Sequence, residues 1–212
     1  MLGVRSTTPI FSTIPSLTEP TMKRRSSRFF RLCRPASLLA GLALATGIGC
    51  ARGPVPETVS SVDLSRYAGL WYEIASNAAG FNDNLVDVTA TYTARTDGQV
   101  DVLNRGIEGT PGGAEQSIVG IARVVDATTN AKLGVRFPSV FGGLFEGEYW
   151  IVALGADYDY AVVTDSLQFT LFVLSRSPVM TQAQYQAILD ELAAKQINTD
   201  FLRITVSSGL AP

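Results

Sequence analysis

Apolar and polar residues alternate in short segments over residues 70–174, and turn-forming residues separate the segments. A period of two is typical of β-strands that bury one face, because successive side chains point to opposite faces of a sheet. The segments follow one another at the spacing of consecutive hairpins. The pattern predicts eight strands, at Leu70–Ala75, Val88–Ala94, Val100–Asn104, Ser117–Asp126, Lys132–Phe137, Gly147–Leu154, Ala161–Thr164 and Phe169–Leu174.

The period changes after residue 180, where a helix is expected. Thr181 and Gln184 match a capping box, in which each side chain bonds the backbone N–H of the other residue. Apolar residues then recur at helical spacing, at Tyr185, Ile188, Leu189 and Leu192. Asp200–Val206 is a further strand-like segment. The predicted fold class is therefore all-β: an eight-stranded antiparallel up-and-down β-barrel with one C-terminal α-helix and a short ninth strand.

The first 49 residues differ in kind from the rest of the chain. Basic residues between Lys23 and Arg34 precede an apolar run at Ala36–Ala45, and this order is typical of an export signal. The run is shorter than the roughly 20 residues that span a bilayer. Met22 stands directly before the basic cluster and is a candidate translation start. We therefore expect residues 1–49 to be an N-terminal extension and export signal.

Gly47-Ile48-Gly49-Cys50 resembles the bacterial lipobox, in which the cysteine receives a diacylglycerol group and becomes the new N-terminus. The alternative is cleavage after Ala45, which would leave a soluble periplasmic or secreted protein with a free thiol. Ala51 is not the aspartate that retains such lipoproteins at the inner membrane, which favours the periplasmic face of the outer membrane. The expected divisions are 50–60 for the lipidated cysteine and linker, 61–208 for the barrel domain and 209–212 for the tail.

The composition of the chain excludes several classes of function. From Cys50 onward the chain has ten Lys and Arg residues against eighteen Asp and Glu, a formal charge of −8, and no basic stripe. Such a body repels phosphate backbones, so no nucleic-acid partner is expected. The chain contains no histidine. This excludes Ser-His-Asp and Cys-His catalysis and histidine ligation of zinc or haem, and we expect neither a metal nor a cofactor.

Several segments resemble signatures of the lipocalin family. Gly69-Leu70-Trp71-Tyr72-Glu73 is similar to the first signature, Gly-x-Trp followed by Tyr-Glu, and Leu174-Ser175-Arg176 is similar to the third. The matching segments between them are Ala90–Tyr92, Val102–Asn104, Glu148–Leu154 and Asp157–Val163. Within lipocalins these segments resemble the branch of bacterial outer-membrane lipocalins and apolipoprotein D. The resemblance implies that Gly69, Trp71 and Arg176 are structural, with the guanidinium packed on the indole at the barrel floor.

The resemblance also implies a ligand cavity inside the barrel, lined by Tyr92, Asn104 and Trp150. Alternation from Trp71 turns Glu73 inward, and the same reasoning on other strands adds further apolar side chains. The expected ligand-binding residues are Glu73, Tyr92, Val102, Asn104, Val135, Phe137, Trp150 and Val152. An apolar cavity with a few polar groups suits a fatty acid or lysophospholipid.

The sequence thus predicts a protein that binds, stores or carries a small amphiphilic lipid and is not an enzyme. Two alternatives stay open at this point. An enzyme on the same barrel could use Glu73 and Tyr92, because burial raises the pKa of a carboxyl group. A structural envelope lipoprotein would fill the barrel with its own side chains. A homodimer is compatible with every one of these hypotheses.

Overall fold

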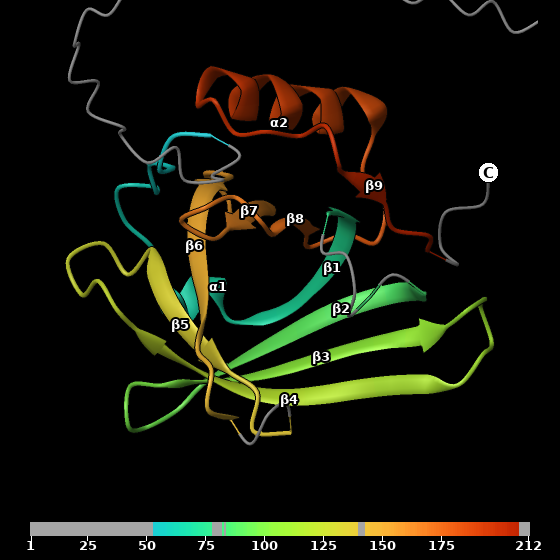
Figure 1. Ribbon diagram of the computed structural model, residues 1–212, viewed down its shortest axis with the longest axis horizontal. Coiled ribbons are helices and arrows are strands. Elements are labelled where there is room, and N and C mark those ends of the chain that lie inside the picture. The colour runs from blue at the N-terminus through green and yellow to red at the C-terminus, as the bar shows by residue number, and fades with distance from the viewer. Residues whose placement is uncertain (1–52, 78–81, 83, 140–142, 208–212) are drawn as a thin grey trace, which may run out of the picture. The chain divides into compact units, whose positions relative to one another are not determined.

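The computed structural model describes residues 53–77, 82, 84–139 and 143–207, and the expected export signal, Cys50 and the last residues lie outside this part. Its strands form one antiparallel sheet in the order β2-β3-β4-β5-β6-β7-β8-β1, and pairing of β1 with β2 closes the sheet into a barrel (Figure 1). This confirms the predicted barrel. The strands are β1 (Gly69–Ser76), β2 (Leu85–Ala94), β3 (Val100–Glu108), β4 (Glu115–Val124), β5 (Lys132–Arg136), β6 (Gly147–Leu154), β7 (Tyr160–Thr164) and β8 (Leu171–Ser175).

The helix after the barrel, α2, covers residues Gln182–Ala194, and Thr181 and Gln184 form the predicted capping box. α2 packs on the outer face of β1, β6, β7 and β8, where Ile188 and Leu192 are buried (Figure 1). These strands are therefore apolar on both faces. Neither described helix is long and apolar enough to cross a membrane.

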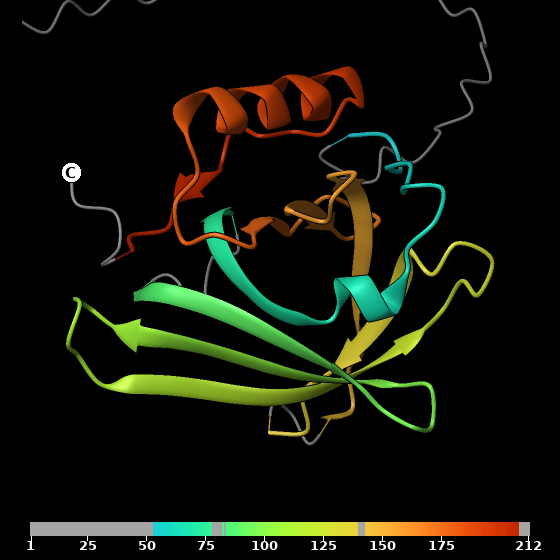
Figure 2. The same ribbon diagram turned by 180° about the vertical axis from the view of Figure 1, so that it is seen from behind.

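A second helix, α1 (Leu64–Tyr67), was not predicted because its four residues are too few to show a helical period. The Asp63 side chain caps it and accepts hydrogen bonds from the Ser65 amide at 2.8 Å and the Ser65 hydroxyl at 2.6 Å. Figure 2 shows α1 at the start of β1, across one end of the barrel. The indole of Trp71 donates to the Tyr67 carbonyl at 2.8 Å and fixes the helix there.

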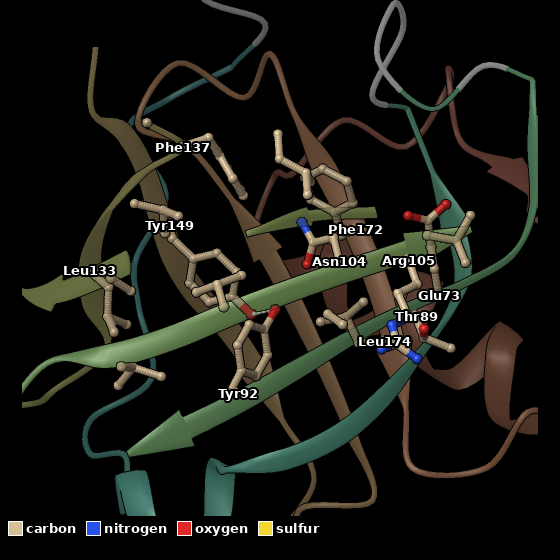
Figure 3. A pocket seen from close by; sticks show the side chains of 18 of the residues that line it. Glu73, Thr89, Tyr92, Asn104, Arg105, Leu133, Phe137, Tyr149, Phe172 and Leu174 are labelled. Atoms are coloured by element: carbon tan, nitrogen blue, oxygen red, sulfur yellow. Dashed lines mark hydrogen bonds between the residues drawn. The ribbon is translucent and has the colours of Figure 1, made fainter. Parts of the chain in front are cut away.

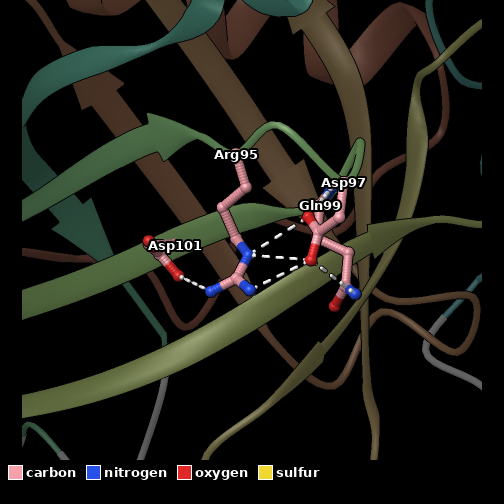
Figure 4. Close-up of polar contacts among 4 residues, drawn as sticks. All are labelled: Arg95, Asp97, Gln99 and Asp101. Atoms are coloured by element: carbon pink, nitrogen blue, oxygen red, sulfur yellow. Dashed lines mark hydrogen bonds and ion pairs between the residues drawn. The ribbon is translucent and has the colours of Figure 1, made fainter.

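The Asp97-Gly98 sequence forms the tight hairpin that it predicts between β2 and β3. The Arg95 amide donates to the Gln99 carbonyl at 2.9 Å, and Gly98 takes a φ of 81°, a backbone conformation that favours glycine. The Arg95 guanidinium lies 3.0 Å from Asp97 and 2.9 Å from Asp101 (Figure 4). These exposed ion pairs fix the turn geometry and contribute little to stability.

β1 and β2 pair only over Gly69–Tyr72 and then diverge. β9 (Arg203–Ile204) occupies the gap by pairing with β1, and the Asp87 amide on β2 donates to the Val206 carbonyl at 2.8 Å. The C-terminal segment therefore bridges the two strands away from α1. The predicted ninth strand is confirmed, although only two of its expected seven residues, 200–206, are regular.

Candidate functional site

The barrel encloses a cavity of about 600 Å³. Most of the side chains that line it are apolar, and the inward positions of β2, β3 and β4 include small residues such as Ala90, Gly106 and Ala122. Large residues at these positions would fill a barrel of eight strands. The barrel is therefore hollow because the sequence places small side chains at these inward positions. Figure 3 shows larger side chains that line the same cavity, among them Tyr92, Phe137 and Phe172.

Three tyrosines form a hydroxyl cluster in the wall near α1. The Tyr149 hydroxyl lies 2.8 Å from that of Tyr67 and 2.9 Å from that of Tyr92. The Tyr67 and Tyr92 rings stack with centroids 5.7 Å apart. Burial raises the pKa of Tyr92 to about 12 and those of Tyr67 and Tyr149 well above 10, so all three hydroxyls are protonated at neutral pH.

Trp71 and Arg176 close the barrel beneath this cluster. The Arg176 guanidinium lies 3.9 Å from the centroid of the fully buried Trp71 ring. Its N–H groups donate to the Leu70 carbonyl at 2.8 Å and to the Ala68 carbonyl at 2.9 Å. Gly69 has a φ of 100°, and a Cβ there would lie 3.3 Å from Arg176 Nη1. Glycine at this position lets the chain turn tightly around the guanidinium.

Glu73 lies in the cavity wall near the C-terminal segment. Its carboxyl accepts hydrogen bonds from the hydroxyls of Thr205 at 2.5 Å and Ser76 at 2.8 Å, and from the Asn82 amide group at 3.1 and 3.2 Å. Burial raises the pKa of this carboxyl, and the three neighbours partly oppose the rise. The carboxyl therefore joins β1, the β1–β2 connection and the segment after β9.

Asn104 also lines the cavity, on β3. Its Oδ1 atom is buried and has no hydrogen-bond partner among the described residues. An unsatisfied buried polar atom costs about 1–3 kcal/mol, so a donor from a ligand or from water would be favourable here.

Comparison with known proteins agrees with this arrangement of a closed barrel, a floor made by Trp71 and Arg176, and an interior cavity. The family model for a lipocalin-like domain matches residues 62–207 of this chain. The chain is a lipocalin. It is 35% identical to the outer membrane lipoprotein Blc of Escherichia coli (strain K12), over 72% of this chain and 85% of that protein. It is 31% identical to apolipoprotein D of Cavia porcellus, over 80% and 91% of the two chains.

Solved structures share the fold at lower identity. Insecticyanin from Manduca sexta superposes with a TM-score of 0.58 at 19% identity, over 72% of this chain and 84% of that one. At this identity the similarity concerns the fold alone.

Six of the eight predicted ligand-binding side chains line the cavity of this lipocalin: Glu73, Tyr92, Val102, Asn104, Val135 and Phe137. The predicted inward placement of Trp150 and Val152 is wrong. Val152 is buried between β6 and α2, and Trp150 stacks under the Lys132 ammonium, 3.9 Å from its ring centroid. The inward side chains of β6 are Tyr149 and Ile151. Every residue over Tyr149–Val152 is apolar or aromatic, so the sequence does not show which pair faces inward.

The cavity also contains residues that the sequence did not indicate. Tyr67 reaches it from α1, which had no recognisable pattern, and Phe172 and Leu174 reach it from β8. Alternation on β8 would have found the last two, because they lie two positions apart. Among the described residues, no group of three or more Cys, Asp or Glu side chains is placed to hold a metal ion.

Proposed function

We propose that this lipocalin binds and carries a single-chain amphiphile, a fatty acid or a lysophospholipid, with the hydrocarbon chain inside the barrel. The observation that carries this proposal is the cavity itself. Its volume of about 600 Å³ lies within the range of pockets that hold small organic ligands, and its wall is mainly apolar. Burial of the chain would supply most of the affinity, at about 25 cal/mol per Å² before the costs of association.

The polar groups of the cavity support an amphiphile over a pure hydrocarbon. Asn104 offers an unpaired acceptor and Glu73 a buried carboxyl on the same inner surface. A ligand without polar atoms would leave the Asn104 acceptor unsatisfied. The polar end of the ligand would therefore lie at the level of these two residues.

Displacement of a fluorescent fatty-acid analogue from the purified, delipidated protein tests the proposal. Val102 is buried in the cavity wall, whereas its neighbour Leu103 lies on the opposite face of β3 and does not line the cavity. Val102→Trp should therefore weaken binding about tenfold or more, and Leu103→Trp, the control for added bulk, should leave it close to wild type. Equal affinities for both variants, or no saturable binding by the wild type, would contradict the proposal.

Neither alternative gains support from the contacts in the cavity. The Tyr92 hydroxyl bonds that of Tyr149, and the Glu73 carboxyl accepts from Thr205, Ser76 and Asn82. Within the described part of the chain, no hydrogen bond therefore joins the two groups that an enzyme would use. A structural lipoprotein with a filled barrel would have no interior volume of this size.

For location, we propose an envelope protein anchored through Cys50 to the periplasmic face of the outer membrane. The support is the lipobox-like sequence at Gly47–Cys50 and the similarity to a relative named as an outer membrane lipoprotein. Incorporation of an alkyne-labelled fatty acid, with the membrane fraction assayed alongside, tests it. Cys50→Ser should abolish labelling and release the protein from membranes, while Cys33→Ser should change neither. Labelling that survives in Cys50→Ser would refute the anchor.

A further inference from the structure

The barrel wall between β1 and β2 is only partly closed by pairing of these two strands. The pairing covers Gly69–Tyr72, four of the eight residues of β1. Beyond it, the Asp87 amide on β2 donates to the Val206 carbonyl at 2.8 Å, and Val206 lies after β9. In a closed barrel each strand ordinarily pairs directly with its neighbours. Here a C-terminal segment, residues 203–207, stands in for part of that pairing, and we call it the latch.

On its other side the latch is bound to β1. Two residues of β9 pair with β1, and the Thr205 amide donates to the Ile74 carbonyl at 2.9 Å. The Thr205 hydroxyl donates to Glu73 Oε1 at 2.5 Å. Figure 1 shows the chain running from β9, beside β1, toward β2. The latch therefore joins the two strands where they have separated.

Hydrogen bonds, and not apolar burial, hold the latch in place. Thr205 is its one buried residue, whereas Ile204 is 56% exposed and Val206 58% exposed. A segment that buries few apolar side chains opens at a smaller free-energy cost than the core of the same protein. We therefore expect the latch to detach while the rest of the barrel stays folded.

The latch lies beside the ligand cavity. A smaller hollow between β1 and β2 is lined by Asp87 of β2 and by Ser207 of the latch. Glu73, Val88 and Thr89 line both this hollow and the barrel cavity. These three residues therefore form a thin partition between the two spaces. When the latch detaches, the cavity is separated from the side of the barrel by this partition alone.

We propose that the latch closes a side entrance to the barrel between β1 and β2, and that its release lets the hydrocarbon chain of a ligand pass sideways into and out of the cavity. The inference rests on the proposed carrier function and concerns the route of exchange. Release breaks the hydrogen bonds of the latch to β1 and β2 and leaves the other strand pairs intact. An entrance of this kind changes the rate constants of binding and release by the same factor, so their ratio, Kd, stays constant.

Thr205→Val tests the side entrance. The substitution removes the hydroxyl that holds the latch to Glu73, and Thr205 does not itself line the cavity. Stopped-flow fluorescence with the fatty-acid analogue and the delipidated protein measures the rate constants of binding and release. Both should rise about tenfold, because the loss of a buried hydrogen bond shifts an equilibrium by about this factor. Kd should stay close to the wild-type value.

Matched controls separate the latch from a general loss of stability. Thr129→Val also removes a hydroxyl that donates to a carboxylate, that of Asp126 at 2.7 Å, but it lies between β4 and β5 and should keep the wild-type rates. A chain that ends at Leu202 lacks the latch and should exchange ligand faster than Thr205→Val. A chain that ends at Ser207 keeps the latch and should exchange like wild type.

The outcomes distinguish this inference from the function on which it rests. Wild-type rates in both Thr205→Val and the chain ending at Leu202 would refute the side entrance and leave the carrier function intact. A faster release alone, with weaker affinity, would also refute it, because Thr205 would then act on the bound ligand and not on its route. No saturable binding by the wild type would contradict the carrier function itself, and the side entrance with it.

Hydrogen exchange on the wild type decides the matter if the variants do not fold. The amides of Asp87 and Thr205 donate the hydrogen bonds that hold the latch to β2 and to β1. They should exchange faster than the amides that pair β2 with β3, because the latch opens without unfolding the barrel. Exchange of both groups at the same rate would show that the latch opens only when the barrel unfolds, and would overturn the proposal.

Discussion

The contact of Arg176 with Trp71 should be a principal determinant of the stability of the barrel floor. Besides stacking on the indole, the guanidinium donates to a ring of backbone carbonyls at 2.7–3.3 Å, those of Arg66, Tyr67, Ala68, Leu70 and Tyr158. Burial lowers the pKa of the guanidinium, although arginine keeps its charge at any ordinary pH. Arg176→Ala removes all of these interactions at once.

The size of the effect follows from the contacts. Arg176 Nη2 has two hydrogens for three carbonyls, Nη1 makes one short bond, and the Nε bond is long at 3.3 Å, so about three full hydrogen bonds are lost. Each contributes about 1 kcal/mol net, and the cation–π contact adds about 1 kcal/mol. Because the Arg176 side chain is partly exposed, the hydrogen bonds and the cation–π contact together contribute less than their simple sum. We expect Arg176→Ala to lower the free energy of unfolding by about 3 kcal/mol.

Urea unfolding, followed by far-UV circular dichroism, measures this difference as a change in midpoint at constant slope. Arg66→Ala is the matched control, because the Arg66 guanidinium also lies over an aromatic ring, 4.0 Å from the Tyr158 centroid, but donates to only one carbonyl, that of Ala156 at 3.2 Å. Arg66 is exposed, and its loss should cost less than about 1 kcal/mol.

The stability costs of Arg176→Ala and Arg66→Ala, compared with each other, test this reasoning. Equal costs would show that the carbonyl contacts of Arg176 contribute nothing beyond its stacking. A cost below about 1 kcal/mol for Arg176→Ala would refute a structural role for the floor pair. Arg176→Lys should fall between the two arginine-to-alanine variants, since an ammonium retains the charge but cannot reach the same ring of carbonyls.

Two further predictions concern buried polar groups. Burial raises the pKa of Glu73 above its ordinary value of 4.5, so its contribution to stability is fully present below pH 4.5 and is lost as the pH rises through the folded-state pKa. The difference in melting temperature between wild type and Glu73→Gln should therefore decrease as the pH rises from 4 to 7. An increase over that range would contradict the raised pKa of Glu73. Tyr149→Phe removes the hydroxyl that bridges two buried tyrosines and should cost about 1–2 kcal/mol in urea unfolding, whereas Tyr160→Phe, whose hydroxyl bonds Glu191 near the surface, should cost less.

Local chemical signals were sufficient to predict several elements. Asp97-Gly98 specifies a tight turn whatever surrounds it, and the hairpin forms there. The capping box of Thr181 and Gln184 likewise depends on two side chains three residues apart, and α2 begins directly after Thr181. Such signals are readable because all of the interacting atoms lie within one short segment.

Long-range contacts could not be predicted from the sequence. The Thr205 hydroxyl donates to Glu73 across 132 residues of chain, and only the closed barrel brings them together. Ala75 follows the inward positions Trp71 and Glu73 by alternation, yet an irregularity in the β1–β8 pairing between Glu73 and Ala75 turns it toward α2 instead. A bulge of this kind changes the face of every later residue in a strand, and the sequence shows no sign of it.

The inward side chains were predicted correctly on β3 but not on β6, and this difference has a single physical cause. The outer face of β3 meets water, so a polar residue such as Asp101 occupies it and the inward set containing Val102 and Asn104 is evident. The outer face of β6 lies partly under α2, so Val152 is as apolar as the inward Ile151. Alternation identifies the inner face only where the outer face is solvated. The inward residues of strands under α2 must therefore be assigned from packing, and a ligand titration read by Trp150 would report the outside of the barrel.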